Sequence, residues 1–277
     1  MKVSTITPCF RMQKYIKLFL EKLSEQTLFA DLQIVLDYNE PSDEELKLVE
    51  EFSVKYPGKI KLLISNPVVP IGTSMNRCIE NSDGQYLCIW NVDDLRTHHS
   101  IEVMAKALDE NPDIDFVYGN YTMVNSFGSR DGAYLDTKVP SETEYTRGMV
   151  IGPFFMFRKS ILEKTGMFDE QLVSGADFDF AVRLGIHGKG MHISDHIGYY
   201  LNEGAGASTR ANSKQPLERT VVELRYGIMD KFNQWGRPYE DEARKYDINH
   251  IVVGGITHPI TQYVPNYSKF IEKNSHP

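Results

Sequence analysis

Short strand-like runs alternate with helix-like segments along the first two-thirds of this 277-residue chain. The runs at residues 3–7, 32–36 and 86–90 are apolar and rich in β-branched or aromatic side chains, as strands are. Between them, residues 15–23 and 42–52 place apolar side chains at helical spacing. Four or five such strand and helix units predict an α/β fold, in which a mostly parallel central sheet is flanked by helices.

Local signals set several boundaries. Ser42 is followed three residues later by Glu45, the pattern of a capping box at a helix start. Gly166 follows a predicted helix at residues 158–165 and suits its C-cap. Residues 191–201 are predicted to hold a pair of strands. Residues 125–147 are rich in Gly, Ser, Asp and Thr and predict a long loop, a feature that is often a lid or a binding loop.

The character of the chain changes near residue 210. Leu217, Val221, Leu224 and Ile228 form a stripe at helical spacing, and the rest is polar with scattered Pro and Gly. We therefore predict a main domain at residues 1–210 and a helical C-terminal extension at residues 211–277. The stripe lacks the Lys, Arg and Trp of a membrane-surface helix, so it predicts packing on the core or on a second copy in a homo-oligomer.

Composition excludes several classes of protein. A net charge of -8 is a poor match to a phosphate backbone, so we expect no nucleic-acid partner. The three cysteines lack CxxC spacing and indicate reduced thiols. No run reaches the roughly 18 apolar residues of a membrane span, and charged residues interrupt any leader-like run near the N-terminus. We expect a cytoplasmic location, with peripheral association at the inner face of a membrane left open, because net charge hides local basic patches.

Polar side chains follow the predicted strands at the edge where ligands bind in open α/β sheets. Phe10 follows the first strand, Asp37 the second, and Asn91, Asp93 and Asp94 the fourth. Partly desolvated carboxylates that repel one another need hydrogen bonds or a cation, and a hard divalent ion such as Mg2+ or Mn2+ accepts such oxygen ligands. The alternative is that Asp93 or Asp94 only caps the helix that follows.

Five segments of the chain carry a family resemblance. In order they read VSTITPCFR, IVLDYNEPSDEE, PIGTSMNRCIENSDGQYLCIWNVDD, GPFFMFRKSILEKTGMFDE and GADFDFAVRLGIHG. Each motif alone is weak, but their order and spacing across about the first 205 residues resemble the inverting, GT-A fold glycosyltransferases of family 2. The resemblance implies a Rossmann-like α/β/α sandwich whose catalytic domain is residues 1–210.

The resemblance also implies donor-binding roles. Phe10, two residues after Pro8, takes the place of the aromatic side chain that packs on the nucleotide base. Asp37 matches an acid that lines the base and ribose pocket. Gly72 and Asn76 fall where the family's third segment approaches the nucleotide.

The next implied roles concern the metal. Asn91, Asp93 and Asp94 occupy the D-x-D-D position, where Asn91 and Asp93 would contact the donor. Asp93 and Asp94 would hold Mn2+ or Mg2+ against the diphosphate, with Glu203 as a further candidate ligand. A solvated loop carboxylate is the other interpretation of Glu203.

On the acceptor side, Asp177 matches the family's general base, and Phe168, Asp169 and Glu170 match the G-x-F-D-E element that shapes this side. A carboxylate whose pKa is raised by partial burial can take the acceptor hydroxyl proton. Asp177 could instead be an acid that only stabilises a helix N-terminus. Asp179 is expected to be solvated or paired with a basic residue one turn on.

Four positions depart from the family pattern. Tyr38 stands where a second acid often contacts uracil, and Asn91 replaces the first Asp of D-x-D. Ala176 replaces the Glu of the E-D motif, and Asn202 stands in place of a family His. These departures put the base identity and the strength of metal binding in question, although Asp93, Asp94 and Asp177 remain.

The leading hypothesis is an inverting glycosyltransferase that moves a sugar from a nucleotide-sugar donor, UDP favoured, to a glycan or lipid-linked acceptor. One alternative is a non-catalytic member that binds nucleotide or glycan, as the departures permit. Another is a sugar nucleotidyltransferase. That class carries a Gly-rich loop after the first strand, whereas this chain has PCFRMQKYI there.

Overall fold

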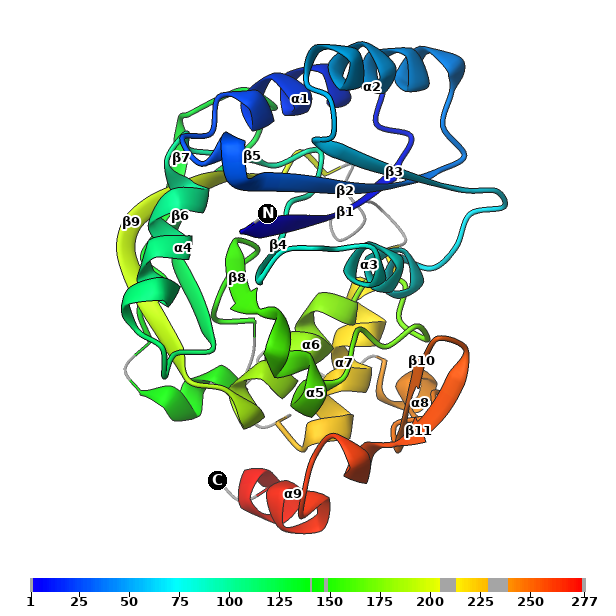
Figure 1. The fold of residues 1–277 in the computed structure, drawn as a ribbon. Helices are drawn as coiled ribbons and strands as arrows, with labels where there is room; N and C mark the ends of the chain where they lie inside the picture. The colour runs from blue at the N-terminus through cyan, green and yellow to red at the C-terminus, as the bar shows by residue number, and fades with distance from the viewer. Residues whose placement is uncertain (1, 140, 147–148, 205–212, 229–238, 276–277) are drawn as a thin grey trace.

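A central sheet organises the fold (Figure 1). The computed structural model describes residues 2–139, 141–146, 149–204, 213–228 and 239–275. The strands of the main sheet are β1 Val3–Phe10, β2 Leu32–Asn39, β3 Ile60–Ser65, β4 Tyr86–Ile89, β5 Leu95–Arg96, β6 Phe116–Val124, β7 Gly132–Leu135, β8 Phe155–Arg158 and β9 Gly190–Leu201. The helices are α1 Ile16–Ser24, α2 Asp43–Lys55, α3 Ile71–Glu80, α4 Ser100–Glu110, α5 Leu162–Thr165, α6 Ala176–His187, α7 Gln215–Tyr226, α8 Glu240–Ala243 and α9 Tyr267–Ser275.

Strand order and direction confirm the predicted α/β class. The order is β3-β2-β1-β4-β8-β6-β9-β5, with β7 paired to β6. The contacts β3–β2, β2–β1, β1–β4 and β6–β9 are parallel, and β8 runs antiparallel between β4 and β6. β7 and β5 also run antiparallel to their neighbours β6 and β9. Most strands, namely β1–β4, β6 and β9, therefore point in one direction, and the carboxyl ends of β1, β2 and β4 meet at one edge.

Helices cover both faces of the sheet. Figure 1 shows α1 and α2 on one side of β1–β3, and α3, α5, α6 and α7 on the other. Phe19, Val49 and Met104 bring α1, α2 and α4 into one buried cluster. Phe180 and Val221 bring α6 and α7 into a second cluster on the opposite face. Burial of these apolar stripes stabilises the fold, because it removes their surface from water.

The predicted caps are present. The Ser42 hydroxyl accepts a hydrogen bond from the Glu45 backbone N–H, and the Glu45 carboxylate accepts one from the Ser42 N–H. Gly166 ends α5 with φ 66°, in the left-handed region that glycine adopts readily. The structure therefore confirms the capping box at Ser42 and the C-cap at Gly166 that the sequence predicts.

Two predictions for the middle of the chain are wrong in detail. Residues 191–201 form one long strand, β9, and not a strand pair; Figure 1 shows it curving along one side of the sheet. The polar Ser194 and Asp195 suggest a turn, but they lie in a bulge where the pairing with β6 shifts register. The predicted loop at residues 125–147 contains β7 and a 3-10 helix, Glu142–Thr146.

The C-terminal extension is not only helical. A two-stranded hairpin, β10 His250–Val253 and β11 Ile256–Pro259, lies between α8 and α9. The predicted apolar stripe packs inward, and Val221 and Ile251 join the same buried cluster as Phe168 and Phe180. The predicted boundary at residue 210 lies outside the described residues. No helix among the described residues has the length and apolar character needed to cross a membrane.

Candidate active site

The carboxyl edge of the sheet carries the residues predicted to bind a donor. In the β1–β2 register, Pro8 lies opposite Asp37 and Phe10 opposite Asn39. The Trp90 N–H donates to the Ile6 carbonyl, which continues the β1–β4 ladder to the turn that begins at Asn91. Parallel pairing therefore brings Phe10, Asp37 and Asn91 to the same edge, as the sequence predicts.

Asp37 is a buried carboxylate with one unpartnered oxygen. Its Oδ1 accepts hydrogen bonds from Ser65 Oγ at 3.3 Å and from Arg77 Nε at 3.2 Å. Its Oδ2 is buried and has no hydrogen-bond partner within the described structure. A buried acceptor left unpaired costs about 1–3 kcal/mol. Asp37 therefore offers an acceptor for an N–H or O–H group of a ligand.

Tyr38 does not take over the position of a second acid. Its side chain is fully buried, and its hydroxyl donates to Glu45 Oε1 at 2.5 Å. The same Glu45 oxygen accepts the Met12 N–H at 2.7 Å. Tyr38 and Glu45 thus tie the loop after β1 to the start of α2, and the tyrosine hydroxyl is not free to contact a base.

The turn after β4 holds two carboxylates in different environments. Asp94 is buried, and its oxygens accept hydrogen bonds from the Leu201 N–H at 3.0 Å and Asn91 Nδ2 at 3.2 Å. Burial, together with the charge of Asp93, raises the pKa of Asp94 to about 8. Asp93 is half-buried, and burial raises the pKa of its carboxyl as well. Burial and mutual repulsion thus disfavour the ionised form of both carboxyls, and a nearby cation would favour it.

The fit to a divalent cation rests mainly on Asp93. Both Asp94 oxygens are used within the fold, whereas no side-chain hydrogen bond to Asp93 is present in the described structure. Within residues that the structure describes, no group of three or more His, Cys, Asp or Glu side chains is arranged to hold a metal ion.

Glu203 is partly exposed and ion-paired. Its carboxylate accepts hydrogen bonds from Lys14 Nζ at 2.7 Å and from the Tyr15 hydroxyl. It lies close enough to Asp93 to raise the pKa of that carboxyl further. Glu203 thus joins the end of β9 to the start of α1, and its role as a further metal ligand stays a prediction.

The predicted acceptor-side residues form a joint between three segments. Asn76 on α3 donates to the Phe168 carbonyl and to Glu170 Oε1, both at 2.9 Å. Glu170 also accepts the N–H groups of Gly254 and Gly255 in the β10–β11 turn, each at 3.0 Å. The joint therefore holds the C-terminal hairpin against α3.

Phe168 and Asp169 in this joint are also buried. Phe168 is fully buried and packs on Phe180 with ring centroids 4.5 Å apart. A side chain at Gly72 would collide with the backbone of Asp169. Asp169 is buried and pairs with Arg225 at 2.9 Å. That Gly72, Asn76, Phe168, Asp169 and Glu170 help to bind a donor or an acceptor stays a prediction. Their effect would be indirect, because they hold the backbone of this region in place.

Asp177 is the second residue of α6. It is half-buried, and its Oδ1 accepts the Phe178 backbone N–H at 2.8 Å. Burial raises the pKa of Asp177, and the nearby carboxylate of Glu218 raises it further. A carboxylate with a raised pKa has the property of a general base. No hydrogen bond or ion pair joins it to the turn after β4 in the described structure.

Asp179, two residues on, belongs to the core. It is fully buried and accepts hydrogen bonds from Arg183, Arg225 and Tyr226. The predicted pair with Arg183 is present, at 2.6 Å, and the alternative of a solvated side chain is wrong. The partners on α7 are 46 and 47 residues away in sequence, so no local pattern could reveal them.

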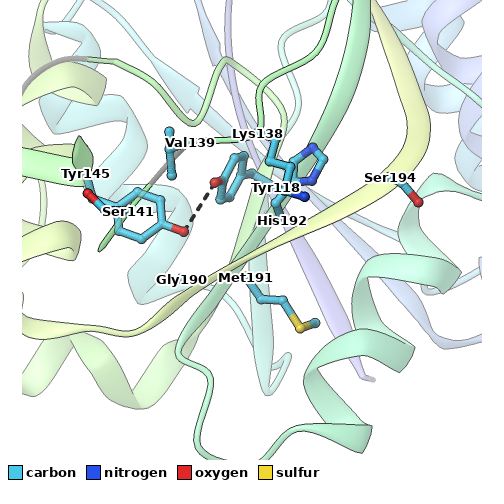
Figure 2. Close-up of a pocket in the computed structure, with 9 residues that line it drawn as sticks. All are labelled: Tyr118, Lys138, Val139, Ser141, Tyr145, Gly190, Met191, His192 and Ser194. Atoms are coloured by element: carbon cyan, nitrogen blue, oxygen red, sulfur yellow. Dashed lines mark hydrogen bonds between the residues drawn. The ribbon is translucent and has the colours of Figure 1, made fainter. Parts of the chain in front are cut away.

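A separate cavity of about 460 Å³ lies over the first half of β6 and β9 (Figure 2). Tyr118 and Tyr145 line it, and their hydroxyls point toward each other at a distance of 3.2 Å. His192 Nε2 lies 2.8 Å from Asn120 Oδ1. The cavity lies at the opposite end of β6 and β9 from Leu201 and Asp94, so it is distinct from the candidate donor edge.

The mostly parallel sheet, with acidic residues at the carboxyl ends of its strands, defines an α/β protein of the kind in which ligands bind at that edge. A family model for glycosyl transferase family 2 matches residues 4–166, more than half of the chain. The chain belongs to glycosyl transferase family 2.

Relatives are distant. An uncharacterized glycosyltransferase of Methanocaldococcus jannaschii is 25% identical over 181 residues, which span 62% of this chain and 60% of that protein. Hyaluronan synthase of Pasteurella multocida is 22% identical over 255 residues, which span 89% of this chain and 25% of that protein. The chain thus spans less than two thirds of either relative.

Solved structures confirm the GT-A-like fold. TarS of Staphylococcus aureus in complex with UDP-GlcNAc matches with a TM-score of 0.67 and 18% identity over 87% of this chain and 74% of that one. A mannosyltransferase from Pyrobaculum calidifontis in complex with GDP-Man and Mn2+ matches with a TM-score of 0.59 and 15% identity, over 88% and 69%. At these identities the likeness concerns the fold.

Proposed function

We propose that this family 2 glycosyltransferase moves a sugar from a nucleotide-sugar donor to an acceptor hydroxyl by an inverting displacement. The observation that carries the proposal is the unpartnered, buried Asp37 Oδ2 on the same sheet edge as the acidic turn at Asn91–Asp94. One feature suits the hydrogen-bond donors of a nucleoside, and the other suits a cation and its diphosphate.

The donor would lie along this edge. Asp37 would accept a hydrogen bond from the base or ribose, and Phe10 would offer its ring to the base. A UDP donor is favoured by the resemblance and by TarS, whose structure contains UDP-GlcNAc. Because the Tyr38 hydroxyl is bonded to Glu45, base selection would depend on Asp37 and on backbone groups.

Asp93 would hold Mn2+ or Mg2+, while Asn91 and Leu201 hold Asp94 in place beside it. When bound, the cation would offset the charge that develops on the departing diphosphate. The raised pKa values of Asp93 and Asp94 support this assignment, because a nearby cation would favour the ionised form of both.

Asp177 would act as the base. In an inverting transfer the acceptor oxygen forms a bond to the anomeric carbon while the bond from that carbon to the phosphate oxygen breaks. The acceptor proton passes to the Asp177 carboxylate, and the nucleoside diphosphate leaves with the electron pair. The raised pKa of Asp177 suits proton abstraction in the transition state.

The acceptor class is a glycan or a lipid-linked glycan. Two relatives are named hyaluronan synthase and poly(ribitol-phosphate) β-N-acetylglucosaminyltransferase TarS, and these names support a polymeric acceptor. A cytoplasmic site of action, peripheral membrane association and a homo-oligomer remain part of the proposal.

A nucleotide screen tests the donor assignment. Unfolding temperature is measured with UDP, GDP, CDP and dTDP, each with and without Mn2+, because a ligand of the native state raises stability by RT ln(1 + [L]/Kd). We expect one nucleotide to raise the temperature in a Mn2+-dependent manner, and we expect Asp93→Asn to remove that dependence. Binding with no transfer from any sugar donor would favour the non-catalytic alternative, and no shift with any nucleotide would contradict the donor site.

A further inference from the structure

Glu218 on α7 holds the segment that leads into α6. Its Oε1 accepts the Val173 N–H at 3.1 Å, and its Oε2 accepts the N–H groups of Ser174 at 2.7 Å and Gly175 at 2.9 Å. Figure 1 shows α7 beside α6, and the two helices are in contact. One side chain from the C-terminal segment thus fixes three consecutive peptide groups before α6.

The packing around this contact is close. Glu218 is fully buried, and a Cβ added to Gly175 would lie 3.1 Å from Glu218 Cβ. Glycine at position 175 therefore allows α7 to approach the segment closely enough for the three bonds. A larger residue at 175 would push the two backbones apart.

Glu218 differs from the other buried acid nearby. Asp179 pairs with two arginines, whereas no Lys, Arg or His lies within salt-bridge distance of Glu218 in the part of the chain that is described. Burial of a carboxylate without a paired cation is costly, and burial raises the pKa of Glu218, although its three N–H partners and the more distant charge of Lys214 act in the opposite direction. An apolar side chain at this position would leave the three N–H groups without an acceptor, so the carboxylate is what holds residues 173–175 in place.

The segment that Glu218 holds places the proposed base. Gly175 is the N-cap residue of α6, its carbonyl accepts the first helical bond from the Asp179 N–H, and Asp177 is the second residue of the helix. Within the described structure, the one hydrogen bond to the Asp177 side chain comes from the adjacent Phe178 N–H, so it does not tie the side chain to another part of the fold. The position of Asp177 therefore depends on how firmly the start of α6 is held.

We propose that Glu218 is a positioning residue for sugar transfer: its carboxylate fixes residues 173–175 and so places Asp177 against the acceptor hydroxyl. This inference rests on the proposed function. If Glu218 has this role, the C-terminal segment contributes to the active site, although the sequence resemblance ends before that segment.

The test compares Glu218→Ala and Glu218→Gln in the full chain. Displacement of a catalytic group by about 1 Å can cost about 100-fold in rate, so we expect Glu218→Ala to lower kcat by about 100-fold. Glutamine keeps an oxygen for Ser174 and Gly175 and loses only the Val173 bond, so we expect it to restore kcat to within about 10-fold of the wild type. Both variants should bind the donor nucleotide with unchanged Kd and full stoichiometry.

The matched control is Glu223→Ala. Glu223 lies on the same helix and pairs with Arg219, one turn away. It should leave kcat within about twofold of the wild type, since it does not contact residues 173–175 in the described structure. Nucleotide titration counts the folded sites, so loss of folded protein cannot be mistaken for loss of kcat.

The outcomes separate the two proposals. If Asp177→Asn abolishes transfer but folded Glu218→Ala keeps a kcat within about twofold of the wild type, the positioning role is wrong and the proposed function stands. The positioning role is also wrong if Glu223→Ala lowers kcat as much as Glu218→Ala does, or if Gln gives no rescue. If Asp177→Asn transfers sugar normally, the proposed base itself is wrong.

Discussion

Arg225 bridges the two buried acids that lock the C-terminal segment to the core. Its Nη1 lies 2.9 Å from Asp169 Oδ2 and 2.7 Å from Asp179 Oδ1. Its Nη2 also donates to the carbonyls of Asp247 and His250. Arg225→Met keeps much of the side-chain volume but leaves two carboxylates short of a cation in a site without solvent.

The expected cost follows from that burial. Removal of one partner from a buried ion pair costs about 3–5 kcal/mol, and Arg225 is only 1% exposed, so solvent cannot replace it. For a chain of this size, each kcal/mol lowers Tm by about 2–4 °C. We therefore expect the unfolding free energy, measured by urea denaturation at pH 7, to fall by about 3–5 kcal/mol and Tm to fall by about 6–20 °C.

The loss of unfolding free energy in Arg225→Met should depend on pH. Burial raises the pKa of Asp179, but the charges and hydrogen bonds of Arg183 and Arg225 outweigh it and hold that pKa below its ordinary value. A lowered pKa stabilises the fold above the unfolded-state pKa near 3.9, and that stability is lost as pH falls through the folded-state value. The difference between wild type and Arg225→Met should therefore stay nearly constant from pH 7 to about 4 and shrink as pH is lowered further.

Arg219→Met is the control on the same helix. Arg219 is 41% exposed and pairs with Glu223, so its loss should cost about 0.2–1 kcal/mol. A loss of less than about 1 kcal/mol in Arg225→Met at pH 7, or a larger loss that does not shrink as pH is lowered below about 4, would refute the reasoning.

Two further predictions concern Gly166 and Asp177. Gly166→Ala should lower the unfolding free energy by about 1–3 kcal/mol, because its φ of 66° with ψ of -176° suits only glycine and the new Cβ would meet the Tyr263 ring. The control is Gly58→Ala, since Gly58 has φ 75° but open space around it, and this substitution should cost less in the same urea assay. Equal costs would contradict the steric part of the argument. The kcat of sugar transfer should rise with pH through a pKa above the ordinary range of aspartate, because the base acts when ionised and burial raises the pKa of Asp177; a rate that stays flat into the acid range would count against Asp177 as the base.

The sequence predicts those parts of the fold that depend on nearby residues. Helical spacing, the Ser42 capping box and Gly166 set element boundaries that the structure confirms. The meeting of Phe10 and Asp37 at one edge was predictable too, because parallel strands bring their carboxyl ends together. The antiparallel insertion of β8 between β4 and β6 has no local signal, because it depends on the pairing of distant strands.

The candidate site could be predicted only in part, for a similar reason. Asp93 and Asp94 are neighbours in sequence, yet Asp94 turns inward to the Leu201 N–H, which is 107 residues away. Glu218 reaches residues 173–175 across more than 40 positions, and it belongs to a segment for which the sequence offers only an apolar stripe. Contacts between distant segments decide which carboxylates are free for chemistry, and composition and spacing do not report them.

The most direct test of the central claim is the rate of sugar transfer by Asp177→Asn with the donor nucleotide identified by the screen. Asparagine keeps the size of the side chain and an oxygen for the Phe178 N–H, so nucleotide binding and Tm should stay close to the wild type. General base catalysis contributes about 100-fold to 10,000-fold, and we expect transfer to fall by at least that lower figure. Transfer at the wild-type rate by a folded, nucleotide-binding Asp177→Asn would contradict the account.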